Sequence, residues 1–299
     1  MKKNNIVKAI IIVFSIFLFS SCTKFSRTQL TQGKSSENFL VNPFIEKDTV
    51  WENEIIIKGL AVIKEGAVLK IMPGTKVKFV KIDLNNDKIG DGELVIEGKI
   101  IAIGEPEKPI IFTSFEKNPA KKDWTFVYID RNQDFIIENC VFSYAFTGLQ
   151  IHYSKGEIKN NIFENNFEGL RYSTDKIFIH NNIFHNNTYG IRFESRRSEA
   201  EISYNEITEN TYGIFSVMRS LIEENKIINN NIYNNHKYNF IMGMEQTDDI
   251  SAPSNWWGKV DSAEINDLIY DKNDDPSIGE VKYRPFLETK VENAGKMKN

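Results

Sequence analysis

The segment NIFENNFEGLRY, residues 161–172, is one of five related copies in the second half of the chain. It is preceded by CVFSYAFTGLQI at 140–151 and followed by NIFHNNTYGIRF at 182–193, NEITENTYGIFS at 205–216 and NIYNNHKYNFIM at 231–242. One glycine aligns the first four copies with spacings of 21, 21 and 23 residues: Gly148, Gly169, Gly190 and Gly213. Periods of this length are typical of solenoids, in which each unit buries its apolar face only against its neighbours.

Each copy contains short runs of β-branched and aromatic residues separated by turn residues, and no helical periodicity. Units of about 21–26 residues with this composition predict the coils of an all-β protein, a single parallel β-helix whose strands stack at about 4.8 Å. Equivalent residues of successive coils then form columns. We expect one interior column to contain four large apolar residues: Phe142, Phe163, Phe184 and Ile207.

A second expected column is polar. Asparagine stands eight residues before the glycine position in four copies: Asn161, Asn182, Asn205 and Asn231. Stacked asparagine side chains can hydrogen-bond along such a column, which predicts an interior ladder at a corner of the coil. Cys140 occupies this position in the first copy, where we expect a buried and unreactive thiol. Asn239 replaces the glycine of the fifth copy and also tolerates a left-handed backbone.

The N-terminal residues 1–22, MKKNNIVKAIIIVFSIFLFSSC, have a different composition. Three lysines precede a short apolar run and small residues, the pattern of a secretory signal. The apolar run is shorter than the roughly 20 residues of a membrane-spanning helix. The ending Phe-Ser-Ser-Cys resembles a bacterial lipobox, and this resemblance implies lipid attachment at Cys22. It predicts an extracytoplasmic lipoprotein held on a membrane, on the outer membrane or cell surface if the bacterium has two membranes.

The charge of the chain excludes some classes of protein. It has 37 Lys+Arg and 41 Asp+Glu, and removal of the three signal-peptide lysines leaves 34 against 41, a net charge near -7. An acidic chain of this kind argues against a nucleic-acid partner. Two cysteines exclude a disulfide-stapled scaffold and a cysteine-rich zinc site.

Several segments resemble the right-handed parallel β-helix repeat proteins of the pectate-lyase-like superfamily. They include GLAVIKEGAVLKIMPGTKVKF at 59–79, GELVIEGKIIAIGEPEKPIIFTS at 92–114, SNWWG at 254–258 and VKYRPFL at 281–287. The resemblance implies a right-handed coil closed by a short C-terminal cap, with Trp256 and Trp257 inside the cap. It leaves the activity open, because the superfamily includes lyases, hydrolases, epimerases, adhesins and accessory proteins of periplasmic metal enzymes.

The chain is therefore expected to divide into five segments. They are a signal peptide at 1–22, a flexible tether at 23–47, the β-helix at 48–258, the cap at 259–287 and a disordered tail at 288–299.

Outward positions of the repeats supply the candidate ligand-binding residues. Arg171 and Arg192 follow the repeat glycine by two residues, while Glu164 and His185 follow the ladder asparagine by three. We expect these four side chains to lie on one side of the coil, as a groove for a polyanion or a sugar in which arginine contacts carboxylates. The alternative is an ordinary solvated face whose charges keep the sheet soluble.

The loop DLNNDKIGD contains the one candidate metal site. Asp83, Asn85, Asp87 and Asp91 alternate in it as oxygen ligands of the kind that Ca²⁺ prefers. Lys88 replaces the glycine of an EF-hand-like loop, so a plain turn between coils is the alternative.

No convergent set of catalytic residues is recognisable in the sequence, so catalytic residues stay unassigned. The leading hypothesis is a lipid-anchored, non-catalytic binding or structural module whose partner is a polysaccharide or an envelope protein. The first alternative is a polysaccharide-active enzyme, a lyase or glycoside hydrolase, with a groove on the β-helix face. The second is an accessory protein for a periplasmic metalloenzyme.

Overall fold

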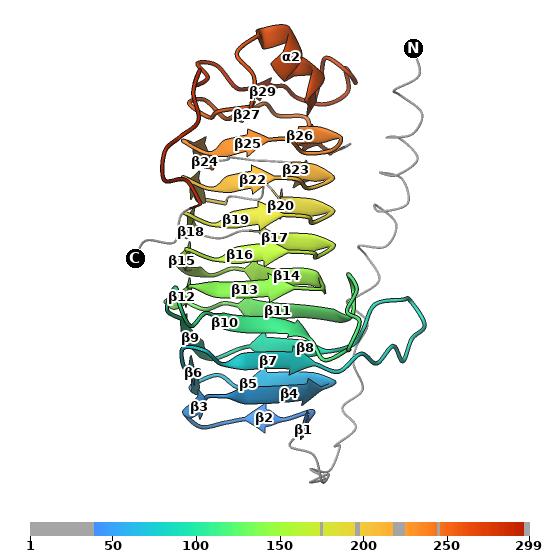
Figure 1. The fold of residues 1–299 in the computed structure, drawn as a ribbon, viewed down its shortest axis with the longest axis vertical. Helices are drawn as coiled ribbons and strands as arrows, with labels where there is room; N and C mark the ends of the chain where they lie inside the picture. The colour runs from blue at the N-terminus through green and yellow to red at the C-terminus, as the bar shows by residue number, and fades with distance from the viewer. Residues whose placement is uncertain (1–38, 174–175, 195–197, 218–224, 244–245, 296–299) are drawn as a thin grey trace.

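The computed structural model describes residues 39–173, 176–194, 198–217, 225–243 and 246–295. Their strands wind into one coil with three long faces, which we name sheets A, B and C (Figure 1). Each coil contributes one strand to each sheet in the order A, B, C, and neighbouring strands within these sheets are parallel. The prediction of an all-β parallel β-helix is confirmed.

Sheet A contains β1 (Phe39–Val41), β4 (Glu54–Lys58), β7 (Lys76–Phe79), β10 (Ile110–Ser114), β13 (Cys140–Ser143), β16 (Ile162–Glu164), β19 (Ile183–His185), β22 (Glu206–Thr208) and β25 (Asn231–Tyr233). Sheet B contains β2 (Phe44–Ile45), β5 (Leu60–Ile63), β8 (Glu93–Ile96), β11 (Trp124–Asp130), β14 (Ala145–His152), β17 (Glu168–Ser173), β20 (Tyr189–Glu194), β23 (Tyr212–Val217), β26 (Tyr238–Met242) and β28 (Ile269–Tyr270). Sheet C contains β3 (Thr49–Trp51), β6 (Val68–Ile71), β9 (Lys99–Ile103), β12 (Phe135–Glu138), β15 (Lys155–Lys159), β18 (Lys176–His180), β21 (Glu201–Ser203) and β24 (Lys226–Ile228).

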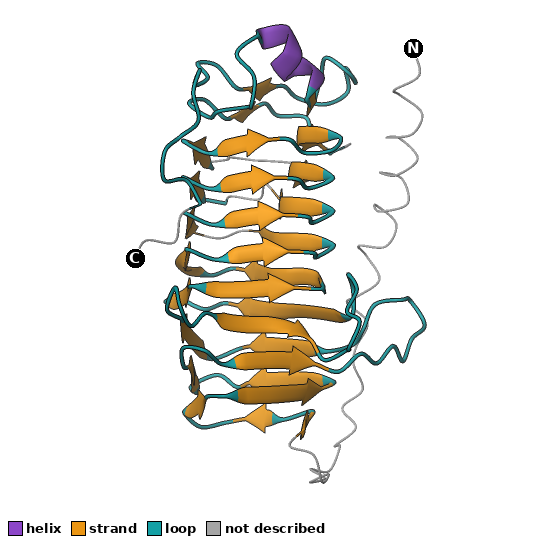
Figure 2. Cartoon of the chain, in the orientation of Figure 1, coloured by secondary structure: helices purple, strands orange, loops and turns teal. Residues whose placement is uncertain are grey.

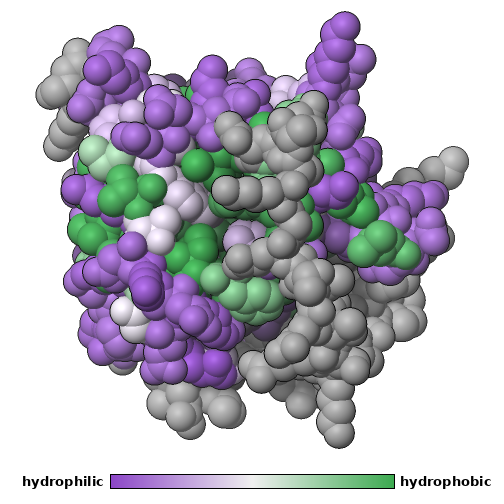
Figure 3. Space-filling model, turned by 90° about the horizontal axis from the view of Figure 1, so that it is seen from below, coloured by the Kyte–Doolittle hydropathy of each residue, from purple (hydrophilic) through white to green (hydrophobic). Residues whose placement is uncertain are grey.

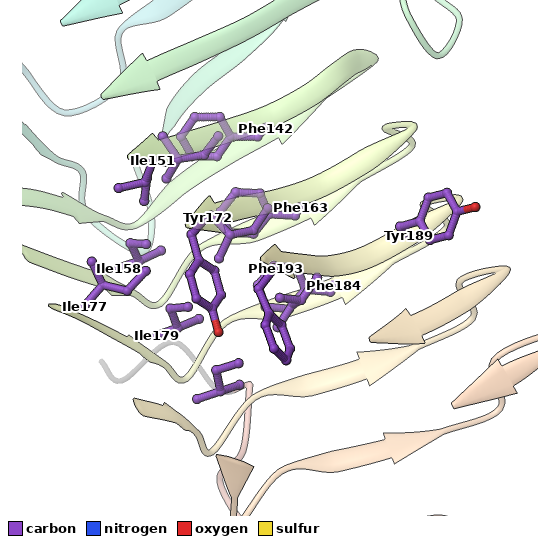
Figure 4. Close-up of a cluster of buried hydrophobic side chains, with 14 of the residues drawn as sticks. Phe142, Ile151, Ile158, Phe163, Tyr172, Ile177, Ile179, Phe184, Tyr189 and Phe193 are labelled. Carbon is purple, nitrogen blue, oxygen red and sulfur yellow. The ribbon is translucent and has the colours of Figure 1, made fainter. Parts of the chain in front are cut away.

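The core is a set of stacked columns that run along the coil axis. The rings of Phe142 and Phe163 stack with centroids 4.9 Å apart, and those of Phe163 and Phe184 stack at 4.8 Å (Figure 4). Ile207 pairs in register with Phe184 and is fully buried. The ring spacing matches the distance between hydrogen-bonded strands, so each coil sets the position of the next.

The asparagine ladder is present, and the structure contains a second ladder that the sequence analysis missed. The first ladder, between sheets C and A, consists of Asn161, Asn182, Asn205, Asn230 and Asn255. The second, between sheets A and B, consists of Asn166, Asn187, Asn210 and Asn235. Cys140 extends the first ladder as expected, because its backbone N–H donates to Asn161 Oδ1 at 2.8 Å and its side chain is buried.

The assignment of Asn231 to the ladder was wrong. Asn231 pairs with Glu206 in sheet A, one position after the ladder residue Asn230. The fifth copy has one extra residue between Asn235 and the glycine position at Asn239, so counting eight residues back from Asn239 stops one residue short of the ladder.

A left-handed residue stands directly before each ladder asparagine. Asn160 and Asn165 have φ values of 56° and precede Asn161 and Asn166. Asparagine tolerates this conformation better than most residues. In the coils of β16 and β19, pairs of consecutive asparagines therefore mark the two corners on either side of sheet A, and the three residues between the pairs form the short strand of that sheet.

Coil lengths and the start of the coil differ from the prediction. Val77 pairs with Phe112 and Phe112 pairs with Phe142, so two coils span 35 and 30 residues instead of 21–26. Loops at 80–92 and 115–123 account for the difference, and the first of them projects from the coil in Figure 1. The coil begins at Phe39 rather than at residue 48, because β1 and β2 pair with β4 and β5.

The C-terminal cap lies over the last coil, as predicted, but its first strand comes before residue 259, the predicted start of the cap. It contains α2 (Ser262–Asp267) and the strand pair β27 (Ile250–Ser251) and β29 (Val281–Lys282) (Figure 2). Trp257 is fully buried, and its ring lies 6.2 Å from that of Tyr283. At the N-terminal end of the described residues, apolar side chains reach the surface between charged ones (Figure 3).

The prediction of a disordered tail was wrong for residues 288–295. This segment, which we name the strap, runs back along the coil from the cap (Figure 1). The backbone N–H of Val291 donates to Asn231 Oδ1 at 2.8 Å, and the N–H of Gly295 donates to the carbonyl of Tyr204 at 2.9 Å. Residues 296–299, the signal peptide with Cys22 and the tether up to residue 38 lie outside the described residues. Within the described part, no helix has the length and apolar character to cross a membrane.

Candidate functional site

The four predicted ligand-binding residues do not lie on one side of the coil. Glu164 and His185 lie on β16 and β19 of sheet A, where His185 Nε2 is 3.3 Å from Glu164 Oε2. Arg171 and Arg192 lie on β17 and β20 of sheet B. The corner at Asn165 turns the chain from sheet A to sheet B, so two outward positions of the same repeat unit can lie on different faces.

Arg192 is buried rather than available to a ligand. Its Nη1 lies 2.7 Å from Glu168 Oε1, and the two side chains are 2% and 0% exposed. The second oxygen of Glu168 accepts a hydrogen bond from Thr147 Oγ1 at 2.8 Å. Burial alone would raise the pKa of Glu168, but Arg192 and the nearby Arg171 outweigh it and hold that pKa below its ordinary value. The pair is therefore ionised.

Arg171 of β17 forms a similar ion pair with Glu194 of β20 in sheet B. Its Nη2 lies 2.8 Å from Glu194 Oε1, and both side chains are mostly buried. Burial opposes ionisation of Glu194, but Arg171 and Arg192 together hold its pKa below the ordinary value. His152 lies beside this pair, and burial together with Arg171 lowers its pKa. Glu194 and His152 thus lie beside the arginine column, in register with Ser173, and the charges of the column are mostly satisfied internally.

The predicted calcium loop uses its oxygens internally. Asp83 accepts from the backbone N–H groups of Asp87 and Lys88 at 3.2 and 2.9 Å. Asp91 Oδ2 accepts from the N–H of Leu84 at 2.6 Å, and Asn85 Oδ1 from the N–H of Asp87 at 3.1 Å. Over the described residues, no group of three or more His, Cys, Asp or Glu side chains is arranged to hold a metal ion.

A hollow of about 670 Å³ lies on sheet C where the strap crosses the corner toward sheet A. This volume is within the range of small-molecule sites. It is lined by residues of β15, β18 and β21, of the corners that follow β18 and β21, and of the strap: Glu157, Phe178, His180, Asn181, Glu201, Ser203, Tyr204, Glu292 and Asn293. We name it the sheet C hollow.

Two aromatic rings form the apolar part of the sheet C hollow. Phe178 is paired in register with Glu157 on one side and Glu201 on the other, and it is 50% exposed. Tyr204 follows β21 at the corner, is 43% exposed and has a left-handed backbone with φ of 55°. Half-exposed rings on adjacent coils offer flat apolar surfaces beside polar groups.

Carboxylates flank these rings. Glu157 Oε1 lies 2.9 Å from His180 Nε2, and Glu157 Oε2 lies 2.9 Å from Lys159 Nζ. Burial would raise the pKa of Glu157, but Lys159 and His180 together lower it below the ordinary value. Glu201 accepts a hydrogen bond from Ser203 Oγ at 3.1 Å and lies 3.2 Å from Lys226 Nζ.

The sequence analysis missed the sheet C hollow, although two signals point to it. Tyr204 occupies the corner position that other coils fill with Asn160, Asn181 and Asn229. Phe178 is an aromatic residue in an outward position of a strand, between two glutamates in register. The repeat pattern could not predict that the strap lines the hollow, because the strap lies outside the repeats.

Two family models match the chain. The right handed beta helix region matches residues 111–251, and the pectate-lyase like beta helix domain matches residues 44–132. With the parallel sheets, these matches show that the chain is a right-handed parallel β-helix repeat protein with a pectate-lyase-like fold. Comparison with curated proteins and with solved structures finds no match. The family defines the architecture, while an activity has to be argued from a site.

Proposed function

We propose that this protein is a non-catalytic binding module that holds a saccharide in the sheet C hollow. The observation that supports the proposal is the pair of half-exposed rings, Phe178 and Tyr204, set among polar side chains in a hollow of suitable volume. A pyranose ring has apolar faces that stack on aromatic rings and hydroxyl groups that hydrogen-bond to carboxylates and amides. Glu157, Glu201 and Asn181 supply such acceptors and donors at the rim.

The lowered pKa of Glu157 favours binding over hydrolysis. A glycoside hydrolase needs a carboxylic acid of raised pKa that donates a proton, next to a second carboxylate. Glu157 has a lowered pKa and stays ionised at neutral pH. Among the carboxyl groups of the described residues, Glu93 has a clearly raised pKa, about 7, but it lies on β8 of sheet B.

We also propose that the protein is exported and anchored by lipid at Cys22. The support is the sequence of residues 1–22, with its lysines, apolar run and lipobox-like ending. Metabolic labelling with a fatty-acid analogue in a bacterial host tests this proposal, because Cys22→Ser should abolish labelling and release the protein from the membrane fraction. Labelling that persists in Cys22→Ser would contradict it.

A glycan array followed by calorimetry with the mature chain tests saccharide binding. Tyr204→Asn removes the ring while keeping a residue that favours the left-handed backbone, and Phe178→Thr removes the second ring from an outward strand position. We expect each substitution to weaken binding by at least about tenfold, as loss of a stacked aromatic contact does. Tyr153→Asn is the matched control, because Tyr153 is also left-handed and 51% exposed but does not line the hollow.

Two results would overturn the proposal. Unchanged binding in both hollow variants would show that the saccharide binds elsewhere. Shortening of the bound glycan or formation of unsaturated ends would show that the protein is an enzyme. The second result would favour the lyase or hydrolase alternative.

A further inference from the structure

We infer that the sheet C hollow selects a saccharide that carries a protonated amine, and that Glu292 of the strap determines this selectivity. The inference rests on the proposed function and adds the chemical class of the ligand. Three carboxylates line the hollow, from three separate elements: Glu157 of β15, Glu201 of β21 and Glu292 of the strap. No Lys or Arg is among the described residues that line it.

The three carboxylates differ in the protein groups that they already contact. Glu157 contacts Lys159 and His180, and Glu201 contacts Lys226 and Ser203. Glu292 is exposed and has no ion-pair partner within the part of the chain that the structure describes. A cationic ligand therefore gains most from Glu292, because its charge is not shared with a protein cation.

The aromatic rings favour the same ligand class. A protonated amine is attracted to the face of an aromatic ring as well as to a carboxylate. Phe178 lies between Glu157 and Glu201 in the register of sheet C, so a ligand on its ring is close to both carboxylates. An acidic saccharide would be repelled by the same groups, and a neutral one would gain nothing from Glu292.

Hydrogen bonds and an ion pair hold the strap in a defined position on the coil. Asn231 binds both backbone groups of Val291, at 2.8 and 3.1 Å, directly before Glu292. The carbonyl of Asn293, directly after it, accepts a hydrogen bond from Asn181 Nδ2 at 3.0 Å. Lys290 Nζ lies 2.6 Å from Glu206 Oε1. The residue between these contacts is thereby held at the rim of the hollow.

A pair of oligosaccharides of equal length, one with free protonated amines and one with neutral acetylated amines, tests the inference. Calorimetry of the mature chain at pH 6 compares β-1,4-linked oligomers of glucosamine with the N-acetylated oligomers of equal length. We expect the amine form to bind at least about tenfold more tightly, with an affinity that falls as salt is raised. Glu292→Gln should reduce the preference to less than about threefold. Glu288→Gln is the matched control, because it removes the same charge from the exposed part of the strap outside the hollow.

The outcomes separate the inference from the proposed function. Equal binding of the two oligomers, or a preference that survives Glu292→Gln, would overturn the inference and leave saccharide binding intact. Binding of neither oligomer, together with no binding on the glycan array, would overturn both. A lysine-rich peptide that binds as tightly as the amine oligomer would show a general cation site and would also overturn the inference.

Discussion

The side chain of Asn187 donates to Asn210 Oδ1 one coil further along, over 3.0 Å, and the same oxygen accepts the backbone N–H of Asn187 at 3.0 Å. Asn187 Nδ2 also donates to the carbonyl of Phe163 at 2.8 Å, one coil back. The Asn187 side chain therefore satisfies a backbone group of the preceding coil, and the Asn210 side chain satisfies the backbone N–H of Asn187, at a corner where the sheets leave these groups unpaired. Asn187 is thus a link between three coils.

Asn187→Ala should lower the free energy of unfolding by about 3 kcal/mol or more, because it leaves buried backbone groups without partners. Asn186→Gly is the matched control one residue earlier. Asn186 has a left-handed backbone with φ of 55° and points outward, so glycine should cost less than about 1 kcal/mol. Urea denaturation of the two variants measures the difference, and equal losses would contradict a structural role for the ladder.

Glu168→Gln should destabilise the protein by about 3–5 kcal/mol at pH 7, because it leaves the charge of Arg192 buried without its partner. The double variant Glu168→Leu with Arg192→Leu should recover at least half of this loss. Glu199→Gln, which breaks the exposed pair with Lys176, should leave the midpoint of urea denaturation essentially unchanged. A small effect of Glu168→Gln would show that the pair is not a buried charge pair in solution.

Glu93 should make stability depend on pH in the direction opposite to most carboxylates. Burial raises its pKa from 4.5 to about 7, so the folded state binds a proton that the unfolded state releases between these values. The stabilisation that protonated Glu93 provides is fully present below pH 4.5. It is lost as the pH rises through 7, which lowers the free energy of unfolding by up to roughly 3 kcal/mol. Chemical denaturation from pH 4 to 8 should show this loss in the native chain, and Glu93→Gln should remove it. A loss of equal size in the variant would rule out Glu93 as its origin.

Asn231→Ala should release the strap while leaving the coils folded. The substitution removes two hydrogen bonds to Val291 and one to Glu206, and leaves the contacts of Lys290, Asn293 and Gly295 to hold the strap. Hydrogen exchange at the amide of Gly295, which donates to Tyr204, should accelerate by at least about tenfold. Asn234→Gly, an exposed left-handed residue of the same coil, is the control. Unchanged exchange at Gly295 would mean that other contacts hold the strap.

The repeat predicted the parts of the structure that depend on one coil touching the next. The column of Phe142, Phe163 and Phe184 was predictable because identical residues one period apart must meet when coils stack. The first asparagine ladder was predictable where the repeat period is regular. The prediction failed at Asn231, where an inserted residue shifts the register. The second ladder, through Asn166 and Asn187, was equally visible in the doubled asparagines, but its meaning depends on where the chain turns.

The sequence by itself determined the architecture of this protein, because short strands with a period near 21 residues can bury their apolar faces only by stacking on their own copies. Only the tertiary structure decided which outward residues meet. It placed Arg171 and Glu164 on different sheets, covered Arg192, and brought Glu292 to Phe178 and Tyr204. The physical reason is that a repeat specifies contacts between equivalent positions of adjacent coils, whereas a corner angle and a returning strap join positions that no period relates.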